Sequence, residues 1–270
     1  MDAIPMHDPE TGEKLSAATP AATVVIFRTD PAGGPPLLCM VERSAKMAFA
    51  PGAAVFPGGR VDPDDHALAE RLAPDLNGSE GAARIAAIRE TLEETGLAIG
   101  IVRDGARPPK HESDAARDAL NGGALFSELL TRFGWSLDLA SITPWSRWRP
   151  PGSLETRIFD TRFYIADAGD AELRGVADQT ENTSLFWAGA QTVLDRADAG
   201  ALTIIFPTRR NLERLALFGD FASAKAHADG VPVRMVLTYV EERADGKYIC
   251  LPDGHGYPVL DEPIERALRG

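Results

Sequence analysis

Apolar positions along the chain recur in two different periods, which predict short strands and longer helices. Two β-branched runs, 22–28 (ATVVIFR) and 37–42 (LLCMVE), flank a turn rich in Pro and Gly and predict a β-hairpin. Four more strands are predicted at 98–102, 156–165, 233–241 and 247–251, the last two as a second hairpin. Helices are predicted at 66–72, 80–95, 112–121, 125–133, 190–197, 207–218 and 222–228. The stretch 141–151 (SITPWSRWRPP) is expected to be a rigid, aromatic segment.

The predicted helix at 80–95 has two sides of different character. Glu90, Glu93 and Glu94 fall within roughly 100° of arc, because residues three and four apart are neighbours on a helix. Its apolar residues lie on a different side: Ile85, Ile88 and Leu92. Crowded carboxylates repel one another, and Arg89, four residues before Glu93, can hold one of them. The remaining charge suits hard cations, since Mg²⁺ binds carboxylate oxygens together with substrate phosphates.

Residues 56–97 resemble the Nudix box, whose pattern is G, five residues, E, seven residues and R-E-U-x-E-E-x-G-U, where U is bulky and aliphatic. The matching positions are Gly59, Arg89, Glu90, Glu93, Glu94, Gly96 and Leu97. Thr91 departs from the pattern at the first U, and Asp65 stands where the box has Glu. Gly59 lies 30 positions before Arg89 (89 − 59), about 16 more than in the family pattern.

This resemblance implies an α/β fold, the Nudix α/β/α sandwich with a mixed β-sheet. Extra helices are expected in insertions at about 62–80 and 103–140. Residues 1–19 are expected to be a polar N-terminal arm, and residues 20–270 a single Nudix hydrolase domain.

The same resemblance implies a reaction and a set of roles. Nudix hydrolases use Mg²⁺ or Mn²⁺ to cleave the pyrophosphate bond of a nucleoside diphosphate linked to another moiety. Glu90 and Glu94 are then the expected metal ligands, with a backbone carbonyl from Gly59 or the glycine before it. Glu93 is expected to be a ligand or a partner of Arg89, and Arg89 to orient the carboxylates.

Residues 43–59 (RSAKMAFAPGAAVFPGG) resemble the signature of the coenzyme A diphosphatase branch of this superfamily. The matching positions are Arg43, Ser44, Gly52, Phe56, Pro57, Gly58 and Gly59. The resemblance implies CoA or acyl-CoA as the substrate, with Arg43, Lys46 and Arg60 as candidate phosphate contacts. Ala48 replaces the second arginine of the signature and removes a bidentate contact. ADP-ribose, nucleotide sugars and dinucleoside polyphosphates therefore stay open as alternative substrates.

A further carboxylate is expected on a loop that faces the helix. Family members often carry a Glu about six residues before a tryptophan-containing strand, as an extra metal ligand or as the base that activates water. Glu181 fits this position relative to Trp187, and Asp178 is its rival.

Net charge and cysteine content indicate which kinds of molecule and compartment suit the protein. The net charge of −12 argues against passive binding to nucleic acid or anionic membranes, which requires basic patches. Cys39 and Cys250 are too few for a disulfide framework and suit a reducing compartment. No apolar run reaches about 18 residues, and the first residues lack the pattern of a signal peptide. We therefore expect a cytoplasmic protein with a small nucleotide-diphosphate substrate, and a homodimer is consistent with the commonest symmetry of soluble oligomers.

Two alternative functions for a protein with the Nudix fold also have to be considered. A non-catalytic ligand sensor with the Nudix fold typically lacks box glutamates, whereas this sequence keeps three. A metal-dependent isomerase on the same fold needs a catalytic cysteine, and neither cysteine lies near the box.

Overall fold

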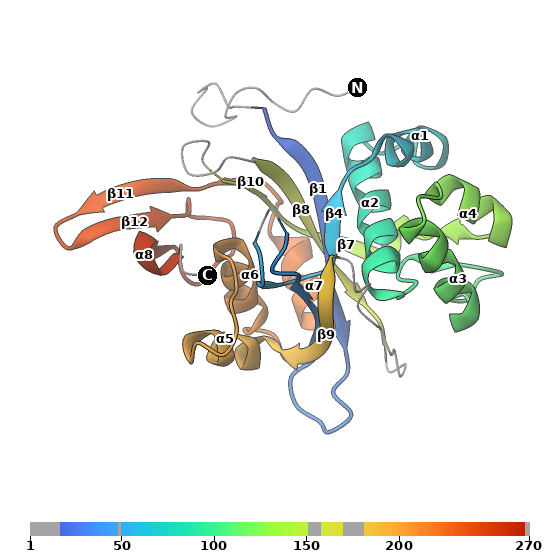
Figure 1. The fold of residues 1–270 in the computed structure, drawn as a ribbon. Coiled ribbons are helices and arrows are strands. Elements are labelled where there is room, and N and C mark those ends of the chain that lie inside the picture. Colours follow the sequence, from blue (N-terminus) through green and yellow to red (C-terminus); the bar gives the residue numbers. More distant parts are fainter. Residues whose placement is uncertain (1–16, 48–49, 151–157, 170–180, 268–270) are drawn as a thin grey trace.

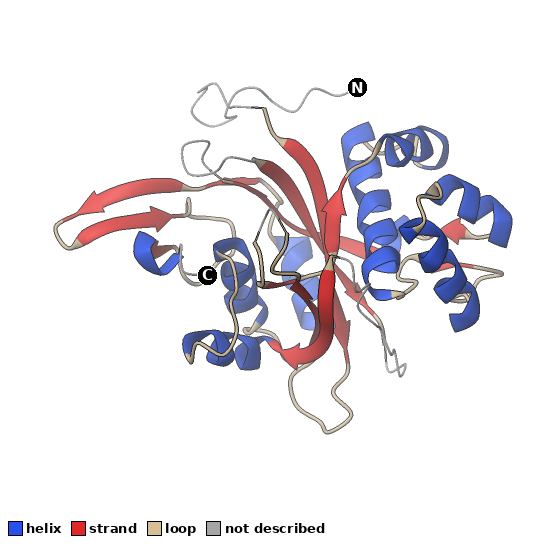
Figure 2. Cartoon of the chain, in the orientation of Figure 1, coloured by secondary structure: helices blue, strands red, loops and turns tan. Residues whose placement is uncertain are grey.

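A mixed eight-stranded sheet forms the centre of the protein (Figures 1 and 2). The structure is a computed structural model that describes residues 17–47, 50–150, 158–169 and 181–267. The strands of this sheet are β1 (Thr19–Arg28), β2 (Leu37–Arg43), β3 (Ala54–Val55), β4 (Gly58–Arg60), β7 (Ile142–Arg149), β8 (Phe159–Asp167), β9 (Asn182–Gly189) and β10 (Met235–Leu237). They follow the order β10-β7-β8-β1-β2-β3, while β4 pairs with β1 and β9 with β2. The β1–β8 and β10–β7 pairs are parallel, and the predicted hairpin of β1 and β2 is antiparallel.

Helices cover both faces of this sheet and give three layers (Figure 1). One face carries α1 (Pro63–Leu72), α2 (Gly78–Thr95), α3 (Lys110–Asn121) and α4 (Phe126–Phe133). The other carries α5 (Ala190–Asp198), α6 (Phe206–Leu215) and α7 (Phe221–Gly230). Smaller elements complete the described chain: β5 (Ile101–Val102), β6 (Ser136–Leu137), η1 (Leu139–Ser141), β11 (Tyr239–Arg243), β12 (Gly246–Cys250), β13 (Asp261–Pro263) and α8 (Ile264–Ala267). The α/β/α sandwich with a mixed sheet is thereby confirmed.

Strand β1 is apolar at consecutive positions because both of its faces are buried. Val24 and Ile26 belong to the core that packs under α2, whereas Val25 and Phe27 belong to the core under α5 and α6. A strand covered on both faces needs no polar alternation. This explains why the run at 22–28 is almost continuously apolar.

Local sequence sets both ends of α2. The Asn77 side-chain oxygen accepts a hydrogen bond from the Ser79 N–H at 3.0 Å and caps the first turn. Gly96 ends the helix with φ at 72°, the left-handed conformation that glycine adopts without strain. Near its start, Gly81 faces Ala69 of α1, where an added Cβ would lie 3.1 Å from the alanine methyl. The small residue lets α1 and α2 pack closely.

Three predicted elements differ from the structure. The stretch 141–151 contains strand β7, which pairs with β8 inside the main sheet. The strand predicted at 98–102 reduces to β5, which pairs with β6 outside the main sheet. The strand predicted at 233–241 divides into β10, which joins the main sheet beside β7, and β11, which forms a ribbon with β12 (Figure 1).

Two arginines of helix α6 are buried, although arginines on a helix are mostly exposed to solvent. Arg214 is 1% exposed, lies over the Trp145 ring and donates to the Trp145 carbonyl at 3.0 Å. Arg210 is 2% exposed and donates to a Glu262 carboxylate oxygen at 3.2 Å. Both therefore join α6 to distant segments.

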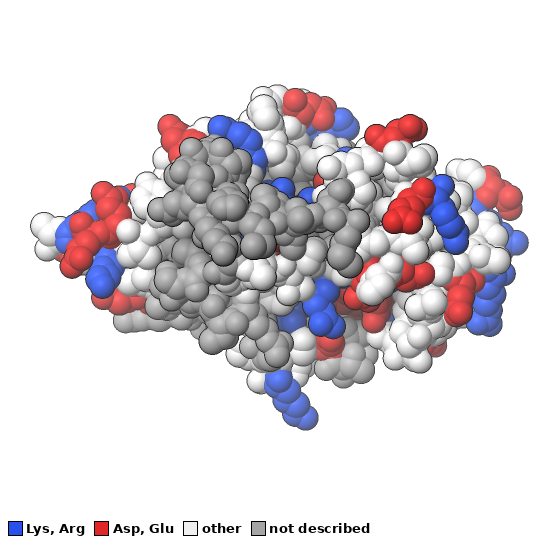
Figure 3. All heavy atoms as spheres, turned by 90° about the horizontal axis from the view of Figure 1, so that it is seen from above, with Lys and Arg blue, Asp and Glu red and all other residues white. Residues whose placement is uncertain are grey.

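The surface seen in Figure 3 carries acidic and basic side chains interspersed, outside the residues drawn in grey. Within the described chain, no helix has both the length and the apolar character needed to cross a membrane.

Candidate active site

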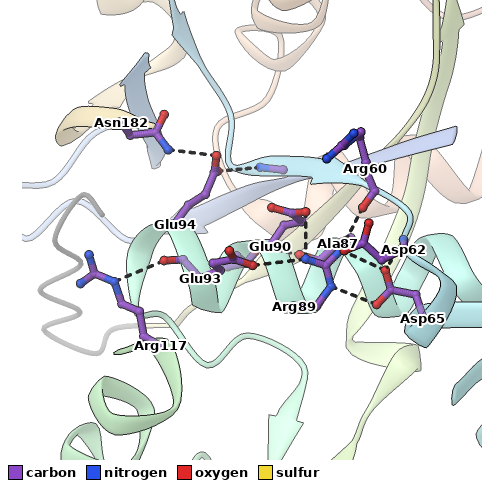
Figure 4. A network of polar contacts seen from close by, with 12 residues as sticks. Arg60, Asp62, Asp65, Ala87, Arg89, Glu90, Glu93, Glu94, Arg117 and Asn182 are labelled. Carbon is purple, nitrogen blue, oxygen red and sulfur yellow. Dashed lines mark hydrogen bonds and ion pairs between the residues drawn. The ribbon is translucent and has the colours of Figure 1, made fainter. Parts of the chain in front are cut away.

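The three box glutamates lie on the side of α2 that faces β4 (Figure 4). The Gly58 N–H donates to Glu94 Oε2 at 2.9 Å and fixes the strand over the helix. A Cβ added at Gly59 would overlap the Glu90 carboxylate, so only glycine allows this approach. The glycine turn and the carboxylates are therefore packed against each other.

Arg89 connects the carboxylates to the start of α1 (Figure 4). Its guanidinium is 7% exposed and donates to both oxygens of Asp65, through Nε at 3.1 Å and Nη2 at 3.0 Å. Nη1 donates to Glu90 Oε1 at 2.9 Å and to Glu93 Oε2 at 3.2 Å, and Nη2 also reaches the Arg60 carbonyl at 2.9 Å. One planar cation thus orders two box glutamates. Asp65, fully buried, is its main partner in the place where the family pattern has Glu.

Arg89 compensates only part of the negative charge of these buried carboxylates. Burial raises the pKa of Glu90 to about 8; Arg89 acts against this shift, while the nearby charges of Glu94 and Glu93 add to it. Burial also raises the pKa of Glu93, Arg89 opposes the shift, and the charge of Glu181 increases it. A cation bound beside these carboxylates would favour their ionised forms.

The donor set fits a hard divalent cation, although part of it is engaged within the chain. Carboxylate oxygens are the ligands that Mg²⁺ and Mn²⁺ prefer, and each oxygen keeps a lone pair after accepting one hydrogen bond. In the described residues, no three Asp, Glu, His or Cys side chains already form a group that could hold a metal. Instead, Glu90 and Glu93 accept hydrogen bonds from Arg89, and Glu94 accepts hydrogen bonds from two N–H groups.

Asn182, which the sequence did not identify, is a further contact of Glu94. Asn182, the fully buried first residue of β9, donates from Nδ2 to Glu94 Oε1 at 2.9 Å. The residue before it, Glu181, is exposed, and its carbonyl accepts the Ser44 N–H at 2.7 Å. Since the charge of Glu181 acts on Glu93, the 181–182 segment adjoins the box helix. Its rival Asp178 lies outside the described residues.

The candidate phosphate contacts lie on segments that adjoin the carboxylates. Arg43 ends β2 and stands opposite Asn182 in the sheet, and Arg60 ends β4 with an exposed side chain. Lys46 is exposed in the turn that follows β2. Ala48 lies outside the described residues. The roles of Arg43, Lys46 and Arg60 in binding substrate stay predictions.

Comparison with known proteins agrees with this architecture. Residues 18–118 match the model of the NUDIX domain. A solved NUDIX hydrolase from Alicyclobacillus acidocaldarius superposes with a TM-score of 0.66 at 27% identity, over 78% of this chain and 96% of that one. Residues 18–118 therefore carry a Nudix domain, and the similarity over most of the chain supports its assignment as a Nudix pyrophosphohydrolase.

The chain is also similar to two curated proteins of particular interest. The acyl-coenzyme A diphosphatase NUDT19 of Gallus gallus is 26% identical over 82% of this chain and 72% of its own length. The putative nudix hydrolase 7 of Caenorhabditis elegans is 25% identical over 67% of this chain and 56% of its own length.

Proposed function

We propose that the protein is a divalent-cation-dependent hydrolase of CoA or acyl-CoA, which cleaves the pyrophosphate bond to give 3′,5′-ADP and a phosphopantetheine product. The observation that carries the proposal is the packing of Glu90 and Glu94 against the Gly58–Arg60 strand, with Arg89 holding Glu90 and Glu93. The similarity to the chicken acyl-coenzyme A diphosphatase supports the choice of substrate class.

Glu90, Glu94 and the Gly59 carbonyl are the groups that would hold Mg²⁺ or Mn²⁺. When bound, the cation supplies charge neutralisation of the diphosphate and a lowered pKa of a coordinated water. Glu94 is oriented by the N–H groups of Gly58 and Asn182. Arg89 keeps Glu90 and Glu93 on one side of the helix, so that their free lone pairs face the same space.

Hydrolysis needs a group that takes a proton from the attacking water. As the water oxygen bonds to phosphorus, the bridging P–O bond breaks and the leaving phosphate departs with that electron pair. Glu181 is exposed on the segment beside the helix, and we assign it the role of base or additional ligand, with Asp178 as the alternative. Glu93, whose pKa is raised by burial, is the carboxylate on α2 placed to share this proton.

Arg43, Lys46 and Arg60 are proposed to bind the substrate phosphates. Each belongs to a segment that borders the carboxylates, and none of them is fully buried. Ala48 removes one arginine of the CoA signature, and this single observation favours a second candidate activity on ADP-ribose, nucleotide sugars or dinucleoside polyphosphates.

A substrate panel with a ligand variant tests the proposal. We expect hydrolysis of CoA or acyl-CoA in Mg²⁺ or Mn²⁺ to exceed that of ADP-ribose, a nucleotide sugar and a dinucleoside polyphosphate in kcat/KM. Glu94→Gln should lower kcat by about 100-fold or more with the fold intact, because changes to outer-shell partners alone cost about 10–100-fold. Glu70→Gln, on the exposed side of α1, is the matched control. A near-wild-type rate in the Glu94 variant would refute the assignment.

The proposal includes a reducing, cytoplasmic location and a homodimer. Cys39 and Cys250 are both buried free thiols, which suits a reducing compartment. Light scattering on the purified chain measures the assembly directly.

A further inference from the structure

Three separate segments meet at the Glu94 carboxylate. Glu94 lies on α2 and is 4% exposed, Gly58 begins β4, and Asn182 begins β9. Each carboxylate oxygen accepts one hydrogen bond from a different segment, Oε2 from the Gly58 N–H and Oε1 from Asn182 Nδ2, both at 2.9 Å. Hydrogen bonds to both oxygens fix the orientation of the Glu94 carboxylate (Figure 4).

The backbone around Asn182 explains why its side chain reaches inward. Strand β9 pairs with β2 in antiparallel register until an irregularity between Glu42 and Arg43, after which Arg43 stands opposite Asn182. The next backbone contact is the 2.7 Å hydrogen bond from the Ser44 N–H to the Glu181 carbonyl. Asn182 is thus buried while its neighbour Glu181 is exposed.

The chemistry of a carboxamide suits this place. Glu94 shares the box helix with Glu90, on whose pKa its charge acts, and an ionised carboxylate only accepts hydrogen bonds, so its neighbour must present a donor. Asparagine supplies that donor without adding negative charge to the cluster. Unlike an arginine, it adds no positive charge that would compete with a cation for the carboxylate. An aspartate of the same size would instead place another acid against Glu94.

We propose that Asn182 is a positioning residue of the metal site, which fixes the orientation of Glu94 and joins the segment that carries Glu181 to the box helix. This inference rests on the proposed function, because it assumes that Glu94 binds the cation. Partners that orient a ligating carboxylate typically contribute about 10–100-fold to metal affinity or activity. Asn182 is expected to contribute in that range although it touches neither cation nor substrate.

Mn²⁺ binding to the purified full-length chain without substrate tests the inference, with free Mn²⁺ followed by electron paramagnetic resonance. We compare Asn182→Ala and the near-isosteric Asn182→Leu with Thr183→Ala, whose side chain is exposed on the same strand and donates to the Glu42 carbonyl. We expect both Asn182 variants to bind Mn²⁺ about 10–100-fold more weakly. Their kcat at saturating metal should fall while the KM for substrate changes less. Thr183→Ala should match the wild type in both measurements.

The outcomes separate this inference from the proposed function. Mn²⁺ affinity within twofold of wild type in both Asn182 variants would overturn the positioning role, even where Glu94→Gln is inactive. Loss of the folded circular dichroism spectrum in both variants would overturn it too, because Asn182 would then act through stability alone. A wild-type protein that binds no Mn²⁺ would refute the proposed function itself and, with it, the inference.

Discussion

The bond between Arg89 and Asp65 gives the sharpest prediction about stability. Asp65 is fully buried, and its two oxygens accept hydrogen bonds from Arg89 at 3.1 and 3.0 Å. Asp65→Asn removes the charge and places an amide N–H against one of the donors around it, which are Arg89 and the Asp62 N–H. Removing one partner of a buried ion pair typically costs about 3–5 kcal/mol, because the other charge is left uncompensated.

The lower end of that range applies here. Arg89 keeps two other hydrogen-bonded carboxylate partners, Glu90 at 2.9 Å and Glu93 at 3.2 Å, so its positive charge is still compensated. We expect the free energy of unfolding to fall by about 3 kcal/mol. For a protein of this size, 1 kcal/mol shifts Tm by about 2–4 °C, so Tm should drop by about 6–12 °C. Urea unfolding and calorimetry measure the two quantities.

A neighbouring aspartate provides the control. Asp62 lies 3.7 Å from the same guanidinium, but its side chain is 52% exposed. Exposed pairs contribute less than about 1 kcal/mol, so Asp62→Asn should change stability by less than that. Equal losses in the two variants, or a loss below about 1 kcal/mol for Asp65→Asn, would refute the reasoning that burial makes this contact strong.

Two other predictions concern the glycine turn and a histidine. Gly59→Ala should lower kcat and Mn²⁺ affinity together, since its Cβ would overlap the Glu90 carboxylate, whereas Gly219→Ala, where a Cβ meets open space, should change neither. Burial and the nearby charge of Arg214 lower the pKa of His227. Its contribution to stability is therefore present above its ordinary pKa of about 6.5 and is lost as the pH falls through the lowered value. Urea unfolding between pH 5 and 8 should show a decline at low pH that His227→Gln reduces, and an unchanged slope would contradict this.

The elements that depend on local sequence could be predicted. The helix α2 was recognisable from its 3.6-residue period, its Asn77 cap and its Gly96 terminus, because these signals lie within one turn of where they act. The neighbouring positions of Glu90, Glu93 and Glu94 followed from the same geometry. The contact between Arg89 and Glu93 followed too, since they are four residues apart on the helix.

Elements defined by distant partners were harder to predict. Strand β7 contains Pro144 and alternates polar with aromatic residues, and its register with β8 shifts between Pro144 and Ser146. Such a strand carries little of the apolar signal used to recognise strands. Arg214 lies on a helix rich in charge, and its partner Trp145 lies 69 residues away. No pattern within α6 identifies that partner.

Asn182 shows the same limit inside the site. Its acceptor Glu94 lies 88 residues away, and the local signal is only a polar residue that begins a strand directly after a suspected functional acid. The role of Glu181 was predicted from its spacing to Trp187. No local sequence pattern predicts that a carboxamide will pair with a carboxylate on another element. A buried amide beside an acid becomes meaningful only when the tertiary contact is known.

The same distinction explains how the box tolerates its enlargement. Asp65 stands six positions after Gly59, as the family Glu does, so the added residues lie between Asp65 and Arg89. They form most of α1 and the turn after it, and Leu68 and Ala69 pack into the apolar core near the first half of α2. The contacts that shape the site come instead from the residues before the added segment, through the Gly58 N–H, the Arg60 carbonyl and Asp65 itself. Because these three contacts fix α2 against β4 and against the first turn of α1, the length of the connecting chain has little influence on where the carboxylates point.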